Sequence, residues 1–248
     1  MNRPVLASVP AGPVEVPGVV AELAGSDAVT PVWRNELGGL TFRLEDADGG
    51  ARYVKWVAAG IPEIDLPGEA ERLEWAGRWA AVPRALAWGS DADGAWLVTA
   101  AIPGRSAVDP RWTADPTAAA AAIGRGLRLL HDTLPAQHCP YDWSAERRLR
   151  GRHEARRRLG EPPAADRLVV CHGDACAPNT LLHDDGTFAG HVDLGSLGVA
   201  DRWADLAVAA WSTEWNYGPG YDSVVYDAYG VAPDPERIAY YRLLWDAT

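Results

Sequence analysis

Three residues with oxygen-bearing side chains, Asp174, Asn179 and Asp193, constrain this chain more than any other feature of its sequence. Asn179 follows Asp174 by five positions, and Asp193, which precedes Leu-Gly, comes fourteen positions later. Apolar, strand-like segments at 168–170 and 190–192 flank the set. Transfer of a nucleotide γ-phosphoryl group needs a carboxylate that orients a hydroxyl, and oxygen ligands that hold Mg²⁺ at the phosphates. The layout therefore predicts phosphoryl transfer, with Asp174 at the hydroxyl and Asn179 and Asp193 at the metal.

The alternative interpretation of these residues is structural. His172-Gly-Asp174 is also a tight-turn sequence, and Asp193 is also a typical loop cap, because Asp and Gly favour such turns. Either piece alone favours the structural interpretation. Both pieces together, in this order and between strand-like flanks, favour the catalytic one.

Composition limits the classes of protein that remain. The 248 residues suffice for one large domain or two lobes, and 48% hydrophobic and 23% charged residues are typical of a globular chain. We expect no signal peptide and no membrane span, because no apolar run approaches the ~18 residues needed. The net charge of −11 disfavours nucleic acid as a partner and weakly favours cations.

The three cysteines, Cys139, Cys171 and Cys176, form no CxxC pair. An odd count without such a pair is typical of a reducing compartment, so the sequence predicts a cytoplasmic protein. Cys171 and Cys176 flank Asp174, and we expect both to be buried, inert thiols.

Lysine usage singles out one further position. Of the 23 basic residues only Lys55 is lysine, and it lies in the alternating, strand-like segment 52–57. An arginine does not reproduce a compact ammonium that reaches nucleotide phosphates from a strand. The alternative is that Lys55 is a lysine retained by chance on a solvent-exposed strand edge. The presence of Asp174, Asn179 and Asp193 makes this alternative less favoured.

The first part of the chain is rich in strand patterns. A turn at Gly38-Gly39 separates two strands and brings backbone close to a ligand without a Cβ, as a phosphate-binding turn does; an ordinary hairpin is the alternative. The Pro-Gly break at 100–104 reads as a hinge whose backbone could hold adenine. The expected elements are a helix at 18–24, strands at 32–34, 40–44, 52–57, 84–88 and 95–99, and a helix at 69–76.

The second part is mainly helical. The expected helices are 117–134, 144–159, 201–212, 221–229 and 235–245. The arginine-rich helix 144–159 reads as a solvated face, with phosphate contact as the minority alternative. His131 reads as a C-terminal cap. Asp205 either stiffens the catalytic loop or favours a helix N-terminus.

These residues together resemble the aminoglycoside O-phosphotransferases, with the kanamycin/neomycin 3′ group nearest and the streptomycin 3″ enzymes as relatives. The resemblance runs from about Val32 to the C-terminus and is strongest in Val170-Cys-His-Gly-Asp-Ala-Cys-Ala-Pro-Asn179 and in the segment 191–206. It implies an α+β, protein-kinase-like bilobal fold. The implied lobes are an antiparallel-sheet nucleotide-binding lobe at 1–101 and a mainly helical catalytic and substrate-binding lobe at 102–248.

The resemblance also implies roles for individual residues. Asp174 would be the catalytic aspartate, and Asn179 and Asp193 would hold Mg²⁺. Lys55 would contact the α/β-phosphates with Glu69 as its partner. The nucleotide, ATP or GTP, would also be held by Gly38, Gly39, Thr99, Ala100 and Ile102.

Three departures from the family pattern lie on the acceptor side. Ser196 stands where the family usually has Arg after Asp193-Leu-Gly195, so a cation beside the phosphoryl group is missing or supplied elsewhere. The segment between Asp142 and Leu168 is short and basic where an acidic flap is usual. Few carboxylates remain for a polycation, and Glu214 and Asp246 are the leading candidates.

The sequence thus predicts a kinase that phosphorylates a hydroxyl of an aminoglycoside and confers resistance. The alternatives are the same chemistry on streptomycin, on a sugar, choline-like or other metabolite hydroxyl, or a silent nucleotide-binding module. The intact set of Asp174, Asn179, Asp193 and Lys55 argues against the last alternative.

Overall fold

The computed structural model describes residues 7–61 and 63–248, which divide into two compact units. The first unit holds the described residues up to Trp75 together with Pro83–Ala101. The second holds Ala76–Val82 and Ile102–Thr248. Residues 1–6 and 62, which belong to the expected N-terminal lobe, lie outside the described part.

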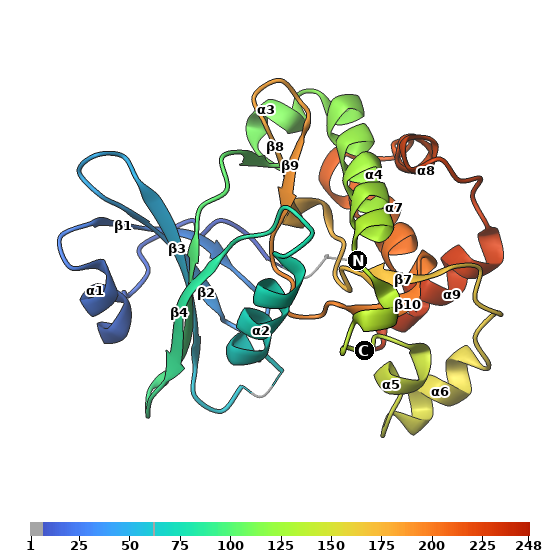
Figure 1. The fold of residues 1–248 in the computed structure, drawn as a ribbon, viewed down its shortest axis with the longest axis horizontal. Helices are drawn as coiled ribbons and strands as arrows, with labels where there is room; N and C mark the ends of the chain where they lie inside the picture. The colour runs from blue at the N-terminus through green and yellow to red at the C-terminus, as the bar shows by residue number, and fades with distance from the viewer. Residues whose placement is uncertain (1–6, 62) are drawn as a thin grey trace. The chain divides into compact units, whose positions relative to one another are not determined.

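The first unit is built on a five-stranded antiparallel sheet in the order β1-β2-β3-β5-β4 (Figure 1). Exposure alternates along β2, and Phe42 and Leu44 pack with Val20 and Val54 as the core of this unit. The expected strands and the helix at 18–24 are confirmed. The elements are α1 (Gly18–Ala24), β1 (Ala28–Arg34), β2 (Leu40–Glu45), β3 (Ala51–Ala58), α2 (Leu66–Ala76), β4 (Ala85–Ser90) and β5 (Gly94–Ala100).

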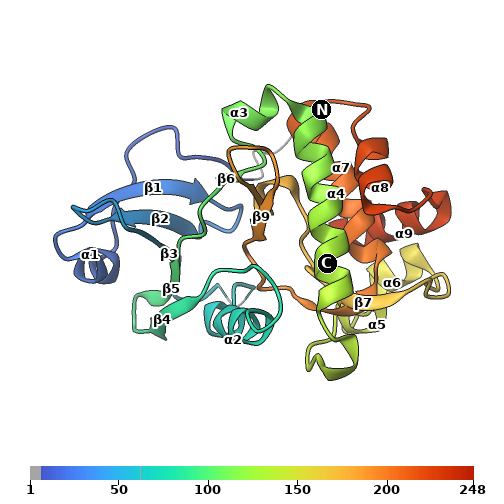
Figure 2. The ribbon, with the colours of Figure 1, turned by 45° about the horizontal axis from the view of Figure 1, so that its top comes forward.

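The second unit is mainly helical, with short strands around the loops of the candidate site (Figure 2). Strand β7 pairs antiparallel with β10, and β6, β8 and β9 form a small sheet. The elements are β6 (Arg105–Ser106), α3 (Pro110–Thr113), α4 (Pro116–Thr133), η1 (Ala136–His138), α5 (Ala145–Arg148), α6 (His153–Leu159), β7 (Leu168–Cys171), η2 (Ala177–Asn179), β8 (Thr180–Leu182), β9 (Phe188–His191), β10 (Gly198–Asp201), α7 (Trp203–Tyr217), α8 (Asp222–Tyr229) and α9 (Pro235–Asp246).

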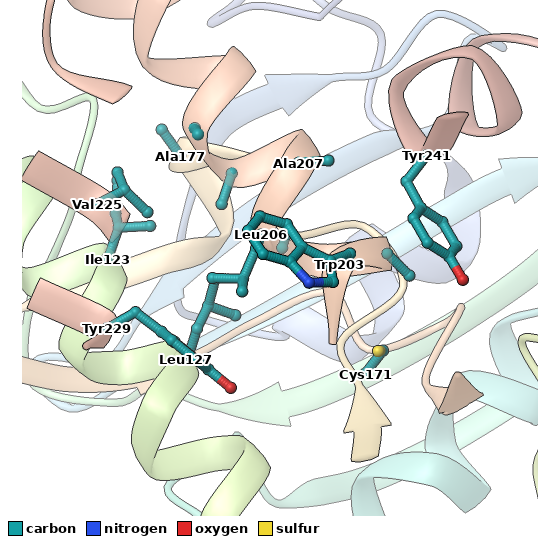
Figure 3. Packing of buried hydrophobic residues seen from close by; sticks show 14 of the residues in the cluster. Ile123, Leu127, Cys171, Ala177, Trp203, Leu206, Ala207, Val225, Tyr229 and Tyr241 are labelled. Carbon is teal, nitrogen blue, oxygen red and sulfur yellow. The ribbon is translucent and has the colours of Figure 1, made fainter. Parts of the chain in front are cut away.

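The core of the second unit lies where α4, α7 and α8 pack together (Figure 3). Ile123, Leu206 and Val225 from these three helices are fully buried. Gly124 allows the close approach of α8, because a Cβ there would lie 2.3 Å from the carbonyl oxygen of Val225. No helix in the described ranges combines the length and apolarity that crossing a bilayer requires.

Two expectations for the second unit were wrong in detail. The expected helix 144–159 is two short helices, because Gly151 takes a left-handed φ of 77° between them. His131 is not a cap: it is 3% exposed, and its ring nitrogens bond Asp205 and the Tyr229 hydroxyl. Periodicity identified both regions as helical but carried no information on these tertiary partners.

The antiparallel first unit and the mainly helical second unit confirm the expected fold class. The segment Ala76–Val82 groups with the second unit: the backbone N–H of His191 donates to the Ala81 carbonyl at 3.0 Å. The nucleotide-binding and catalytic roles expected for 1–101 and 102–248 stay predictions.

Candidate active site

An ion pair between Lys55 and Glu69 is the principal polar feature of the first unit. Lys55 lies on β3 and Glu69 in the first turn of α2. The Lys55 Nζ lies 2.7 Å from one Glu69 carboxylate oxygen and 2.9 Å from the other. Glu69 is only 3% exposed, so the lysine compensates a buried charge. The expected pairing therefore exists, and it fixes the ammonium on the surface of the sheet.

The Gly38-Gly39 turn joins β1 to β2 in the same sheet. The Asn35 side-chain oxygen accepts from the Gly39 N–H at 2.7 Å, and Gly38 has a φ of 86°. A Cβ on Gly39 would lie 2.7 Å from the Asn35 side chain. The geometry of the turn itself thus accounts for glycine at both positions. The expected contact of these glycines with phosphates stays a prediction.

The expected adenine-binding stretch starts at the end of β5 with Thr99 and Ala100. The N–H groups of Ala100 and Ala101 donate to the carbonyls of Arg84 and Ala51. These two donors are therefore engaged within the first unit, and the expected adenine contact of the stretch that ends at Ile102 stays a prediction.

In the second unit, the loop that carries Asp174 is anchored by a buried carboxylate on α7. Asp205 is fully buried, and its two oxygens accept from the backbone N–H groups of His172 at 2.6 Å and Gly173 at 2.9 Å. His131 bonds the same carboxylate at 2.9 Å. Asp205 therefore stiffens the loop, which decides between the two interpretations of its sequence position.

Asn179 and His172 connect the Asp174 loop to the segment before Asp193. The Asn179 side-chain amide donates to the Asp174 carbonyl at 2.9 Å and to its carboxylate at 3.2 Å. The Val192 N–H donates to the Asn179 carbonyl, and a His172 ring nitrogen lies 2.9 Å from the Val192 carbonyl. The structure thus brings together the three residues that the sequence motif singled out.

The electrostatics around Asp174 suit a cation. Burial and the neighbouring Asp193 carboxylate raise the pKa of Asp174. The Asp174 Oδ1 is buried and has no hydrogen-bond partner among the described residues. Asp193 adopts a φ of 65°, which non-glycine residues rarely take. Two nearby carboxylates and the Asn179 amide oxygen form an all-oxygen donor set, which fits Mg²⁺.

The two residues expected to bind the acceptor lie on α7 and at the end of α9. Glu214, on α7, is exposed, and its carboxylate lies 3.6 Å from the Arg242 guanidinium. Asp246 is exposed at the end of α9. Trp211, Trp215 and Trp245, from the same two helices, pack together with ring centroids 4.6 to 6.3 Å apart. Three packed indole rings thus accompany the two carboxylates, and acceptor binding by these residues stays a prediction.

Sequence reasoning missed further residues that position the catalytic loop. The Ser212 hydroxyl accepts from the Ala177 N–H at 2.8 Å, and the Trp143 indole donates to the Gly173 carbonyl at 3.1 Å. Both are distant in sequence from the loop, so no local pattern signals them. Cys171 is buried as expected, whereas Cys176 is only partly buried. Desolvation raises the pKa of both thiols, which is consistent with the inert character expected of them.

Comparison with known proteins agrees with this arrangement. Residues 34–241 match the model of the phosphotransferase enzyme family. The chain is 38% identical over 231 residues to an aminoglycoside 3′-phosphotransferase from Streptomyces fradiae, covering 77% of this chain and 84% of the relative.

Two solved structures extend the similarity to the fold. The crystal structure of an aminoglycoside-3′-phosphotransferase of type VIII aligns with a TM-score of 0.74 at 31% identity, over 90% of this chain and 94% of that one. Aminoglycoside phosphotransferase APH(3″)-Id from Streptomyces rimosus, in complex with ADP and streptomycin, aligns with a TM-score of 0.70 at 29% identity, over 92% and 95%.

These matches confirm the protein-kinase-like fold and the family resemblance drawn from the sequence. The matched region contains Lys55 and Glu69 in the first unit and Asp174, Asn179 and Asp193 in the second. The chain belongs to the phosphotransferase enzyme family and, within it, to the aminoglycoside phosphotransferases.

Proposed function

We propose that this protein transfers the γ-phosphoryl group of ATP or GTP to a hydroxyl of an aminoglycoside, at the 3′ position. The observation that carries the proposal is the Asp174 carboxylate. It is held by Asn179 on a loop anchored to Asp205, yet its Oδ1 keeps an unused acceptor position among the described residues. Such an oxygen is suited to accept the proton of an incoming hydroxyl.

The reaction assigns a task to each part of this loop. The acceptor hydroxyl donates to Asp174, and its oxygen forms a bond to the γ-phosphorus while the bond to the β–γ bridging oxygen breaks. The hydroxyl proton passes to the Asp174 carboxylate, and the nucleoside diphosphate leaves with the bonding electron pair. Asn179 and Asp205 keep the carboxylate at one place, so no reorientation is needed during transfer.

The proposal also gives the expected metal- and nucleotide-binding residues their roles. Asn179 and Asp193 would hold Mg²⁺, which when bound neutralises negative charge on the nucleotide phosphates. Lys55, held by Glu69, would contact the α/β-phosphates. Gly38, Gly39, Thr99, Ala100 and Ile102 would complete the nucleotide site.

The acceptor assignment rests on the relatives, whose names specify aminoglycoside 3′-phosphorylation. Glu214 and Asp246 would bind amino groups of the cationic substrate, and both are exposed. The net charge of −11 favours approach of a polycation. We place this activity in the cytoplasm, on the three free cysteines, and expect it to confer antibiotic resistance.

A coupled assay of nucleoside diphosphate release tests the proposal. Wild type and Asp174→Asn are compared with ATP and GTP against kanamycin, neomycin, streptomycin and neutral sugars. We expect turnover with kanamycin or neomycin that is lost in Asp174→Asn, while nucleotide binding stays near wild type. Retained turnover in the variant would contradict the role of Asp174.

Streptomycin is the second candidate acceptor, because a similar structure was solved with ADP and streptomycin. Turnover with streptomycin alone in the same assay would assign the 3″ type. Turnover only with neutral sugars would assign a metabolite acceptor.

A further inference from the structure

Arg148, at the end of α5, is held differently from its arginine-rich surroundings. Its side chain is half-buried, and its guanidinium carbon lies 5.0 Å from the centre of the Trp143 ring. The Nε donates to the Thr248 hydroxyl at 3.0 Å. Arg147 and Arg150, its neighbours in the same segment, are exposed. Stacking on one side and a hydrogen bond on the other thus fix the direction of this one guanidinium.

The indole beneath Arg148 is hydrogen-bonded to the loop that carries Asp174. Trp143 is 2% exposed, and its indole N–H donates to the carbonyl of Gly173, the residue before Asp174. The Thr248 hydroxyl in turn donates to the Leu244 carbonyl at 2.8 Å, so the other support is a helix end. The guanidinium therefore rests on the indole that bonds the backbone next to the proposed catalytic carboxylate.

The charge of Arg148 is not paired in a salt bridge within residues 7–61 and 63–248. The Asp174 carboxylate acts on it only at longer range. Its two terminal NH₂ groups make no hydrogen bond to any described residue. Burial and the charge of Arg152 lower the pKa of Arg148, and Asp174 acts in the opposite direction. A guanidinium keeps its charge even so, and a desolvated one with free donors is suited to bind an anion.

The proposed reaction brings an anion to Asp174, whose loop Trp143 joins to Arg148. The transferring phosphoryl group must reach the hydroxyl held by Asp174, and its equatorial oxygens carry negative charge in the transition state. Ser196, after Asp193-Leu-Gly195, contributes no charge. We propose that Arg148 is a catalytic residue whose terminal NH₂ groups contact the phosphoryl oxygens during transfer, an inference that rests on the proposed function. Arg148 gains and loses no proton, while the hydroxyl proton still passes to Asp174 and the diphosphate leaves.

The proposed contact with the phosphoryl group distinguishes Arg148 from the other arginines of segment 144–159, which the sequence predicts to be solvent-exposed. Arg152, whose charge also acts on Arg148, uses one of its terminal NH₂ groups to donate to the Ala247 carbonyl. The alternative is that Arg148 only faces the cationic acceptor. It would then repel the acceptor, and removing the arginine would lower the acceptor KM. Kinetics separate the two roles, because a contact made only in the transition state changes kcat and leaves KM nearly unchanged.

Steady-state kinetics of Arg148→Met, Arg148→Ala and the matched control Arg150→Met test the inference. We expect Arg148→Met to lower kcat by roughly 10²- to 10³-fold, as loss of one charge-stabilising donor does, with acceptor KM and nucleotide Kd within about threefold of wild type. Arg150→Met keeps wild-type kcat. Added guanidinium ion restores part of the activity of Arg148→Ala but not of Asp174→Asn.

A second measurement needs no acceptor. Binding of ADP with aluminium fluoride, a mimic of the transferring phosphoryl group, is measured by calorimetry beside ADP alone. We expect Arg148→Met to weaken binding of ADP with aluminium fluoride but not binding of ADP alone. Its thermal unfolding should match that of Arg150→Met. Equal weakening of both, or kcat within about twofold of an active wild type, overturns the role of Arg148 alone. An inactive wild type overturns the proposed function, and this inference with it.

Discussion

The Asp205 carboxylate accepts a 2.6 Å hydrogen bond from the backbone N–H of His172, a residue 33 positions earlier in the chain. A second bond from the Gly173 N–H and a third interaction with His131 complete its environment. A fully buried carboxylate on α7 therefore determines the backbone geometry of the loop that carries Asp174.

We expect Asp205→Asn to lower the free energy of unfolding by about 2–3 kcal/mol, because one of the two accepting oxygens becomes an NH₂ group that cannot accept from a backbone N–H. Burial raises the pKa of Asp205, but the bond and charge of His131 outweigh it, and the net pKa is lowered. This contribution is present above the ordinary value of 3.8 and is lost as the pH falls through the lowered pKa. Urea unfolding of both proteins from pH 7 to pH 2 checks this, and a constant difference would contradict it.

The pair of Lys55 and Glu69 combines a structural and a functional role that two variants separate. Lys55→Met removes the cation paired with a carboxylate that is 3% exposed, so we expect a loss of about 3 kcal/mol in stability and a loss of activity. The double variant with Glu69→Leu should regain most of the stability but no activity. Recovery of nucleotide turnover in the double variant would show that Lys55 acts only as a structural partner.

The raised pKa of Asp174 predicts a response to metal. Burial comes first among its causes and the Asp193 carboxylate second, so the carboxyl of the metal-free protein should titrate above 3.8. Mg²⁺ bound by Asn179 and Asp193 should lower this pKa, and Asp193→Asn should lower it without metal. Carbon-13 NMR titration of the carboxyl measures both shifts, with the exposed Asp185 as a control that Mg²⁺ leaves unchanged. If Mg²⁺ left the pKa of Asp174 unchanged, the result would contradict the metal site.

A side chain at Gly173 would meet both backbone strain and a steric clash. At Gly218 it would meet the backbone strain alone. Both have a left-handed φ, 86° and 96°, so alanine at either position carries a backbone strain of about 1–2 kcal/mol. A Cβ on Gly173 would also lie 2.1 Å from the Ser196 carbonyl oxygen, whereas nothing lies within 4 Å at Gly218. Gly173→Ala should therefore cost at least about 2 kcal/mol more than Gly218→Ala in chemical unfolding. Equal losses would show that strain alone is involved.

The sequence predicted those parts of the fold that local patterns determine. Alternation predicted β3 and an apolar run predicted α4, because burying one face of an element dictates its spacing of apolar residues. The strand β2 and the helices α8 and α9 were also expected at their places. The spacing of Asp174, Asn179 and Asp193 predicted that these residues form one site. They come together because β7, η2 and β9 hold adjacent loops, as the hydrogen bond from the Val192 N–H to the Asn179 carbonyl shows.

What the sequence could not predict depends on partners distant in the chain. His131 reads as a helix cap, yet it bonds Asp205, 74 positions away. The arginines of 144–159 are equivalent in sequence, and only packing on Trp143 and the bond to Thr248 set Arg148 apart. Helix α7 continues to Tyr217, beyond the expected end at Ser212, because the helix stops only where Gly218 takes a positive φ.

Direct identification of the product tests the central claim most sharply. The protein is incubated with Mg²⁺, nucleotide and kanamycin, and the recovered aminoglycoside is analysed by mass spectrometry and by phosphorus and proton NMR. We predict one added phosphoryl group at the 3′-hydroxyl with wild type and unmodified kanamycin with Asp174→Asn. Nucleotide hydrolysis without phosphate on any aminoglycoside, or equal phosphorylation by both proteins, would contradict the account.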